Sequence, residues 1–482
     1  MKKSLSKAVA LAATLGAAAS AHAVNVDQNG LGQVLLYPVY TAEEGNVTAV
    51  HVTNTTDEYK AVKVRFVEGM NSQEVLDFNL YLSPNDVWTG GVVQTATGAA
   101  LVTQDNSCTA GALATEGQPF VTYLFDGSYP VPGVGIRPDS VSSAARTRVG
   151  HLEVIEMGVV DPAQVLVTGV TAGAAIKHGA NGVPGNCEAV RTAWNTGGVW
   201  LTTPSAGVAA PSGGLYGSAT VVNVEAGTEF GVEVTALANF SGGTVLHRQP
   251  GDEAPSLADS QTTASFANGA SLQFVNGVDA VSSVLMKTSI KNDFAFGAGL
   301  NAQTDFVVTF PTKSQYVNNG GTLAGNVYTP NAAIAPFTAG WNVDTSKACE
   351  TINVSYYDRE ERTQQLSVNQ ISPRPPQAQG IALCYETNVF SIGDSKVIGG
   401  EFVRTQLNLD SSFQTGWLNI ALTATGRELE GNNPNLPGLE SVFGLPAIGF
   451  AATAIQNGDV GGLLSNYAGA YTHKATATVV TP

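Results

Sequence analysis

Three short runs of alternating apolar and polar residues, between Asn46 and Trp88, constrain the fold of this chain most strongly. They are NVTAVHVTN, KAVKVRFVEG and EVLDFNLYL, and each places apolar side chains at every second position. A period of two with one apolar face is typical of a half-buried antiparallel strand. Asn, Asp, Gly and Ser residues between the runs predict turns. The sequence therefore predicts a three-stranded meander that covers one side of a sandwich-type core.

The first 23 residues predict export. Three lysines accompany a short apolar run, Ala8–Ala19, and Ala21-His22-Ala23 fits an A-x-A cleavage site. This order is typical of a bacterial secretory signal peptide. We therefore expect a signal peptide over residues 1–23 and a mature chain that begins at Val24. No later stretch approaches the roughly 20 uninterrupted apolar residues of a membrane helix, so we expect no transmembrane segment.

Acidic residues outnumber basic ones. The chain has 39 Asp and Glu against 23 Lys and Arg, a formal net charge of −16. Loss of the signal peptide removes three lysines and no acidic residue, which makes the charge more negative. Such a surface repels nucleic acid and anionic lipid, so neither is an expected partner. Only 13% of residues are charged, yet apolar content is ordinary, which fits an exported all-β protein and not a disordered chain.

All four cysteines, Cys108, Cys187, Cys349 and Cys384, lie after the signal peptide. An even number of cysteines in an exported protein favours two disulfides, and four cysteines allow three pairings. We favour Cys108–Cys187 with Cys349–Cys384, because each bridge then stays within one half of the chain. The alternative, a metal site, lacks a C-x-x-C motif and a histidine at ligand spacing.

The length of the chain favours more than one domain. A polar segment rich in Gly and Pro follows Asn239 and predicts a boundary. We place an N-terminal β-sandwich domain at residues 24–245 and a C-terminal β-rich domain at residues 246–482. The expected fold is mainly β, with antiparallel, immunoglobulin-like sandwich modules, long Gly/Ala/Ser-rich loops and one short helix.

The sequence predicts the secondary structure of three segments in the second half of the chain. Asp279 predicts the N-cap of the one short helix, from Ala280 to about Lys291. The apolar segment Gly444–Ile455 fits either a strand or a helix. The tail Ala468–Val480 predicts a strand that closes a sheet.

Several stretches, in the same order across most of the mature chain, resemble a known family. They are NSQEVLDFNLYLSPNDVWTG, HLEVIEMG, VDAVSSVLMKTSIKNDFAF, TDFVVTFPTK and GLPAIGFA. The chain resembles a family of secreted proteins of Gram-negative bacteria that are usually described as hypothetical or cell-surface proteins. Where we expect Trp in the family's version of TDFVVTFPTK, this chain has Phe306. The resemblance implies an exported β-rich surface protein and transfers no catalytic residue.

No catalytic motif stands out. Nucleophile elbows, H-E-x-x-H and P-loops are missing from the sequence. His51 and His151 lie within predicted strands, where structural histidines are more common than ligands. The pair Glu153 and Glu156 fits a solvated strand better than an acid–base pair. We therefore expect no enzyme and assign no catalytic, cofactor-binding or metal residue. No D-x-D-x-D-G calcium loop occurs in the sequence. Calcium binding therefore remains a possibility only because the chain is acidic and expected to be exported.

Two surface hypotheses remain. If the second and third runs form a simple hairpin, Lys63 and Arg65 face the same way as Asp77. These residues then form either an exposed ion ladder or a contact patch for another subunit, and the weakness of exposed pairs favours the ladder. Trp194 and Trp200, in a loop-rich region, form a candidate sugar-stacking platform.

The sequence thus predicts a non-enzymatic protein of the cell surface or the extracellular space, with a structural, adhesive or matrix role. Edge strands are templates for strand addition, so self-association or contact with other surface components is expected. The alternatives are a β-sandwich protein that binds or cleaves carbohydrate, with polysaccharide as its partner, and a ligand carrier in the periplasm.

Overall fold

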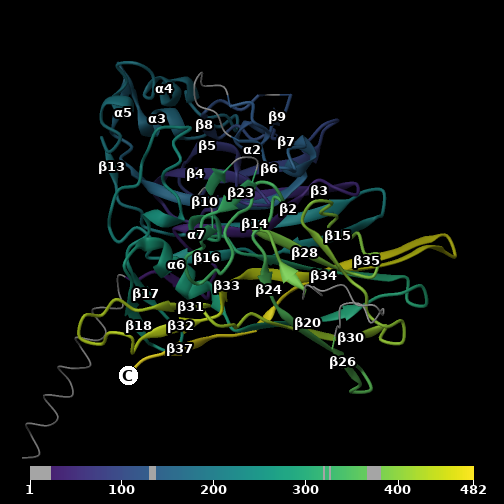
Figure 1. The fold of residues 1–482 in the computed structure, drawn as a ribbon. Coiled ribbons are helices and arrows are strands. Elements are labelled where there is room, and N and C mark those ends of the chain that lie inside the picture. The colour runs from purple at the N-terminus through teal and green to yellow at the C-terminus, as the bar shows by residue number, and fades with distance from the viewer. Residues whose placement is uncertain (1–22, 115, 130–136, 318–320, 325–326, 366–380) are drawn as a thin grey trace, which may run out of the picture.

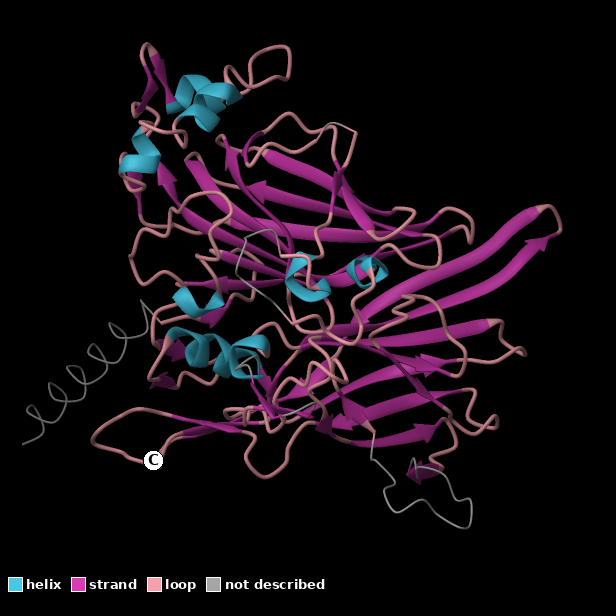
Figure 2. Ribbon diagram, turned by 45° about the horizontal axis from the view of Figure 1, so that its top comes forward, coloured by secondary structure: helices cyan, strands magenta, loops and turns pink. Residues whose placement is uncertain are grey.

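Strands make up most of the regular structure. The computed structural model describes residues 23–114, 116–129, 137–317, 321–324, 327–365 and 381–482. Its strands form mostly antiparallel sheets stacked in layers, and this arrangement fits a β-sandwich (Figures 1 and 2). The mainly β fold predicted from the sequence is confirmed, while the immunoglobulin-like topology stays a prediction. Of the predicted signal peptide, residues 1–22 lie outside the described residues.

The first half of the chain forms two large sheets. The eight-stranded sheet contains β1 (Asn25–Val26), β16 (Thr235–Ala238), β2 (Val34–Thr41), β10 (Val149–Val160), β4 (Tyr59–Glu68), β5 (Glu74–Leu82) and β8 (Cys108–Ala110) in that order, with β13 (Val208–Ala209) paired to β10. The six-stranded sheet contains β15 (Thr228–Val232), β14 (Leu215–Asn223), β3 (Asn46–Asn54), β6 (Val87–Gln94), β7 (Ala99–Val102) and β9 (Gln118–Pro119) in that order.

The three predicted strands exist, but they do not form one meander. β4 and β5 are a hairpin, whereas β3 lies between β14 and β6 in the other sheet. The connection from β3 to β4 crosses between sheets, and Asn54 braces it by donating hydrogen bonds to the Glu58 and Ser83 carbonyls (2.7 and 2.9 Å). The prediction of a meander is therefore wrong, because alternation identifies the buried face of a strand and not its partner.

The second half forms two five-stranded sheets. One contains β26 (Thr363–Gln365), β25 (Asn353–Asp358), β30 (Thr415–Ala421), β20 (Ser289–Ala295) and β36 (Lys474–Thr476) in that order. The other contains β29 (Arg404–Leu407), β28 (Thr387–Ile392), β21 (Ala302–Thr309), β34 (Ile448–Val460) and β35 (Leu463–Thr472). The smaller sheets pair β11 (Val165–Val167) with β12 (Val170–Thr171), β17 (Thr263–Ser265) with β18 (Ser271–Gln273), β19 (Met286–Lys287) with β33 (Leu445–Pro446), β22 (Gly321–Ala324) with β23 (Val327–Pro330), β24 (Glu350–Thr351) with β27 (Ala382–Leu383), and β31 (Glu428–Glu430) with β32 (Ser441–Phe443) and β37 (Thr478–Val480).

The predicted helix is present but shorter and shifted. Helix α6 spans Gly277–Leu285, and the Asn276 side chain, not Asp279, caps it by accepting from the Asp279 amide (2.8 Å). The chain turns extended at Met286, and pairing with β30 and β36 makes the following segment β20. Tertiary pairing thus overrides local helix preference.

The prediction of a single helix is also wrong. The loops contain further helices of four to six residues, which are too short to show helical periodicity in the sequence. They are α2 (Tyr123–Asp126), α3 (Ala172–Ile176), α4 (Cys187–Thr192), α5 (Val199–Thr202) and α7 (Ser314–Val317).

Two disulfides form, Cys108–Cys187 and Cys349–Cys384, as predicted. Each bridge stays within one half of the chain, and the described residues contain no free cysteine. The strands of the large sheets also divide by halves, with Asn25–Ala238 in the first pair of sheets and Ser289–Thr476 in the second. One hydrophobic cluster nevertheless runs through both halves. The domain boundary at residues 245 and 246 stays a prediction.

Buried polar contacts join the halves. The Thr309 hydroxyl donates to the Pro38 carbonyl (2.6 Å), and the amide of Glu386 donates to the Met70 carbonyl (3.1 Å). The side chain of Glu386 is fully buried, and neither carboxylate oxygen accepts a hydrogen bond from the described residues. Burial raises the pKa of this carboxyl well above its usual range, and the nearby Lys313 charge offsets burial only in part.

Replacing Glu386 with glutamine is expected to stabilise the protein above neutral pH. A carboxyl whose pKa is raised in the folded state contributes stability that is complete below its unfolded pKa and is lost as pH rises towards the folded pKa. Glutamine keeps the shape without the charge, so E386Q should gain at least about 1 kcal/mol at pH 8 and nothing at pH 4. Urea unfolding at both pH values measures this difference. A loss of stability at pH 8 would show that the carboxylate has a stabilising partner.

Candidate binding groove

A long hairpin near the C-terminus projects beyond the rest of the molecule (Figures 1 and 2). It consists of β34 and β35, and we refer to residues 448–472 as the arm. The segment that fitted either a strand or a helix is thus a strand, because β34 pairs with both β21 and β35. Gly461 and Gly462 form the tip with positive φ angles of 66° and 86°, which glycine adopts without strain.

The arm exposes apolar side chains. Val460, Leu463, Tyr467 and Tyr471 are 56%, 72%, 61% and 68% exposed. Asp459 is the one charged residue in the arm. Contiguous exposed apolar surface of this kind usually marks an interaction site.

The base of the arm is fixed to the body. The side chain of Asn292 donates to the Tyr471 carbonyl (2.5 Å), and Asn466 donates to the Ala226 carbonyl (2.6 Å). The Thr472 hydroxyl donates to the carboxylate of Glu233. The arm is therefore held at a defined angle while its tip stays exposed.

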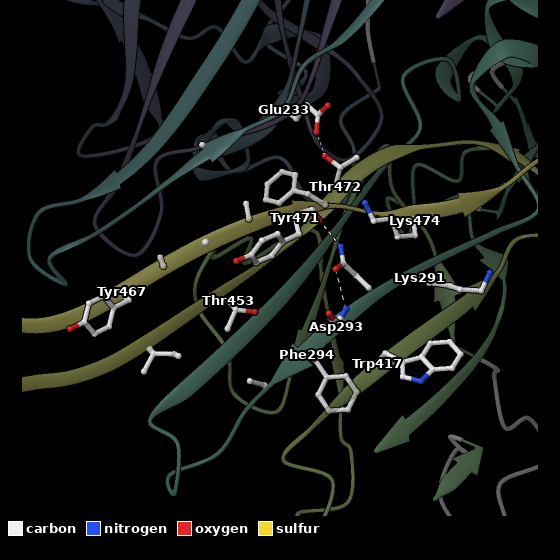
Figure 3. Close-up of a pocket in the computed structure, with 18 residues that line it drawn as sticks. Glu233, Lys291, Asp293, Phe294, Trp417, Thr453, Tyr467, Tyr471, Thr472 and Lys474 are labelled. Atoms are coloured by element: carbon white, nitrogen blue, oxygen red, sulfur yellow. Dashed lines mark hydrogen bonds between the residues drawn. The ribbon is translucent and has the colours of Figure 1, made fainter. Parts of the chain in front are cut away.

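A groove of about 860 Å³ runs beside β35 (Figure 3). Six consecutive residues of β35, Tyr467–Thr472, line it, together with Lys291–Ala295 of β20 and with Gly231 and Glu233 at the end of β15. Phe450, Thr453 and Ile455 of β34 line the groove as well, so it extends over a face of the arm. β35 is the last strand in the order of its sheet.

The outer face of the β25–β30–β20 sheet forms the other wall. Tyr357, Trp417 and Asp293 lie side by side in register across these strands. The rings of Tyr357 and Trp417 stack, with centroids 4.5 Å apart and planes 15° from parallel, and Trp417 is 37% exposed. In the next row on the same face, Lys291 and Lys474 lie directly opposite each other. Figure 3 shows Lys291 near Trp417, at the end of the groove away from Tyr467, with Lys474 beside Thr472.

The predicted contact patch is not a free surface. The register is as expected, because Arg65 lies opposite Asp77, but Lys63 is fully buried and the Arg65 and Asp77 side chains are only 13% and 10% exposed. Lys63 pairs with Asp77 and donates to the Asp252 carbonyl, and the Gly251 amide donates to Asp77 (3.3 Å). A loop 170 or more residues later in the chain therefore covers the patch, which excludes both the exposed ladder and the subunit contact.

The predicted sugar platform is also wrong. Trp194 and Trp200 are 7% and 0% exposed, and their planes are 44° apart. They pack with Tyr81 and His247, where the Trp194 indole donates to the Tyr81 hydroxyl (2.8 Å) and Tyr81 stacks on Trp200 (5.2 Å). Burial lowers the pKa of His247 to about 4, so this cluster is neutral and belongs to the core.

The remaining candidates take structural positions. His51 is exposed on β3, and His151 is buried beside Thr387. The carboxylates of Glu153 and Glu156 are buried as ion pairs with Arg65 and Lys60, so the expectation that they are solvated is wrong. Within the described residues, no group of three or more His, Cys, Asp or Glu is placed to hold a metal ion, so calcium has no assigned ligand there.

Comparison of the chain with protein-family models, with curated proteins and with solved structures gives no match. The resemblance to secreted Gram-negative proteins therefore stays a prediction. None of the helices in the described part of the chain has the length and apolar character needed to cross a membrane.

Proposed function

We propose that this protein is an exported, non-enzymatic protein of the bacterial surface or extracellular matrix, which assembles through the edge of its arm. The observation that supports this most is the composition of β35. Its ten residues, LLSNYAGAYT, contain no charged residue and no proline, although the strand ends a sheet and borders an open groove.

Natural proteins protect the edges of their sheets with short strands, charges, proline or bulges, because an unprotected edge pairs with other strands. The other strands that end the four large sheets, in the described residues, follow this rule. Each has five residues or fewer, and the longest, β15, carries Glu229. β35 has twice that length and carries neither a charge nor a proline, although its pairing with β34 contains a bulge and β15 contacts it. It is therefore the edge best suited to accept a partner strand.

A second copy of this chain is the partner that we propose. Two β35 strands that pair antiparallel about a two-fold axis satisfy both edges at once. The chain is strongly acidic, but an arm with one charge brings the copies together where repulsion is weakest. Structural or adhesive assembly at the surface follows from such pairing.

Replacing Tyr467 and Tyr471 with lysine tests the proposal. Both side chains are mostly exposed, so the core is unaffected, while two positive charges beside the edge oppose pairing with an identical copy. We expect the native protein to sediment as a dimer or larger assembly at micromolar concentration and Y467K/Y471K as a monomer.

Val275 and Ile334 provide a matched control. They are 72% and 58% exposed and lie outside the arm, so V275K/I334K adds the same charge elsewhere. This variant should assemble like the native chain. A native protein that stays monomeric throughout the concentration series, or equal assembly of both variants, would contradict the proposal.

A further inference from the structure

We infer that the Trp417 wall of the groove is a binding site for a carboxylated sugar within a glycan. This site uses residues other than the β35 edge, so it goes beyond assembly through the arm and does not depend on it. Three features of the wall support it: an aromatic platform, a pair of lysines without an ion-pair partner, and an exposed acceptor, Asp293, beside the platform.

The platform is the Trp417 ring. Its stacking on Tyr357 fixes the ring's orientation, and more than a third of its surface still faces solvent. Sugar rings present a face of C–H groups, which packs against an aromatic face as other apolar groups do. A rigid, exposed ring on a sheet is thus prepared for a sugar, in contrast to the buried Trp194 and Trp200.

The lysine pair supplies the charge. Lys291 and Lys474 lie opposite each other on adjacent antiparallel strands, an arrangement that destabilises a sheet when both residues are positive. Neither ammonium forms an ion pair with a carboxylate of the described residues, and Lys291 donates only to the Ser289 hydroxyl (2.9 Å). In a chain with 39 acidic residues, two adjacent lysines without acidic partners indicate an external anion.

The polar groups between these features favour a sugar over a simple anion. Asp293 lies in register beside Trp417, and Asn419 lies beside Lys291. Asp293 is exposed, whereas the Asn419 side-chain carbonyl is buried and cannot contact a ligand. The Asp293 carboxylate accepts hydrogen bonds, which sugar hydroxyls can donate. A sugar stacked on Trp417 would thus meet an acceptor for its hydroxyls and ammonium groups for its carboxylate.

The net charge of the protein limits the choice of ligand. A densely charged polyanion such as nucleic acid is repelled by a chain of net charge −16, whereas two lysines can neutralise the carboxylates of a short acidic sugar segment. We therefore commit to a glycan that carries uronic-acid-type sugars. A peptide strand in the groove is the competing outcome, and it would depend on β35 and not on Trp417.

Calorimetric titration with trigalacturonic acid, and with its methyl ester as the uncharged control ligand, tests the site. We expect K291Q/K474Q to weaken binding of the acid by about tenfold or more, because charge-assisted hydrogen bonds are lost, and to leave binding of the ester unchanged. W417A should abolish binding of both ligands, and W417F should retain part of it.

The same variants are compared by thermal unfolding and sedimentation. Native-like unfolding and assembly of K291Q/K474Q would show that any loss belongs to the site and not to the fold or the arm. The inference is overturned if the native protein binds neither ligand, or if the acid binds K291Q/K474Q as tightly as the native chain. Loss of acid binding in Y467K/Y471K alone would indicate a ligand on β35 and would overturn it as well.

Discussion

Replacing Arg146 with alanine is expected to lower the free energy of unfolding by about 3–5 kcal/mol, because the change leaves buried carboxylates without a counter-charge. The guanidinium is fully buried and bonds Glu68 twice (2.6 and 2.9 Å), Asp139 (2.7 Å) and the Val141 carbonyl (3.0 Å). It also lies over the Phe125 ring, 4.3 Å from the centroid. Asp139 in turn accepts from the Trp341 indole (3.2 Å), so Arg146 supports a contact between the two halves of the chain.

The decrease in the free energy of unfolding caused by R146A should depend on pH. Burial opposes ionisation of Glu68, but the Arg146 charge and the hydrogen bonds that Glu68 accepts outweigh burial and lower its pKa. A carboxyl whose pKa is lowered in the folded state contributes stability that is present above its unfolded-state pKa. This stability is lost as pH falls through its folded-state pKa. Urea unfolding should therefore give a larger difference between R146A and the native protein at pH 7 than at pH 4.

Arg137 offers a control for the same substitution. Its ion pair with Asp344 is exposed, at 39% and 41%, and should contribute less than about 1 kcal/mol. R137A should thus unfold almost like the native protein. Equal losses for R137A and R146A, or a loss for R146A that does not change with pH, would contradict the assignment of the buried cluster.

The sequence was sufficient to predict strands but not their neighbours. The alternation in β3 follows directly from its burial, with Thr48, Val50 and Val52 inside. Its pairing with β14 could not be predicted, because the two strands are about 170 residues apart and the local sequence does not specify a partner strand. β4 shows a further limit, since Lys60 and Lys63 are buried in a strand covered on both faces. Charged residues suggested an exposed face, and long-range ion pairs made burial possible.

The residues of the candidate groove also could not be brought together from the sequence, because strand neighbours were not predictable. Trp417 lies in β30, and its ring is oriented by stacking on Tyr357, more than 50 residues earlier in the chain. The opposed lysines are likewise distant in sequence, and only the pairing of β20 with β36 brings them together.

Removing the Cys108–Cys187 bridge by substitution of both cysteines with alanine is expected to destabilise the protein by about 4.5 kcal/mol. The bridge joins β8 to the start of α4 across a sequence separation of 79 residues. A cross-link over a long loop restricts the unfolded chain strongly, so its loss favours unfolding. The bridge also holds the segment that leads from α4 to Trp194, which packs in the buried cluster with Tyr81. We therefore expect a change in near-ultraviolet circular dichroism as well.

The second bridge tests whether the length of the closed loop or the local packing sets the contribution of a disulfide to stability. Cys349–Cys384 spans 35 residues, so C349A/C384A should cost about 4 kcal/mol, slightly less than the loss for C108A/C187A. Urea unfolding of the two variants measures the difference, and added reductant should destabilise the native protein but not a chain that lacks both bridges. If C349A/C384A is clearly the less stable variant, then local packing around each bridge, and not the length of the closed loop, sets its contribution.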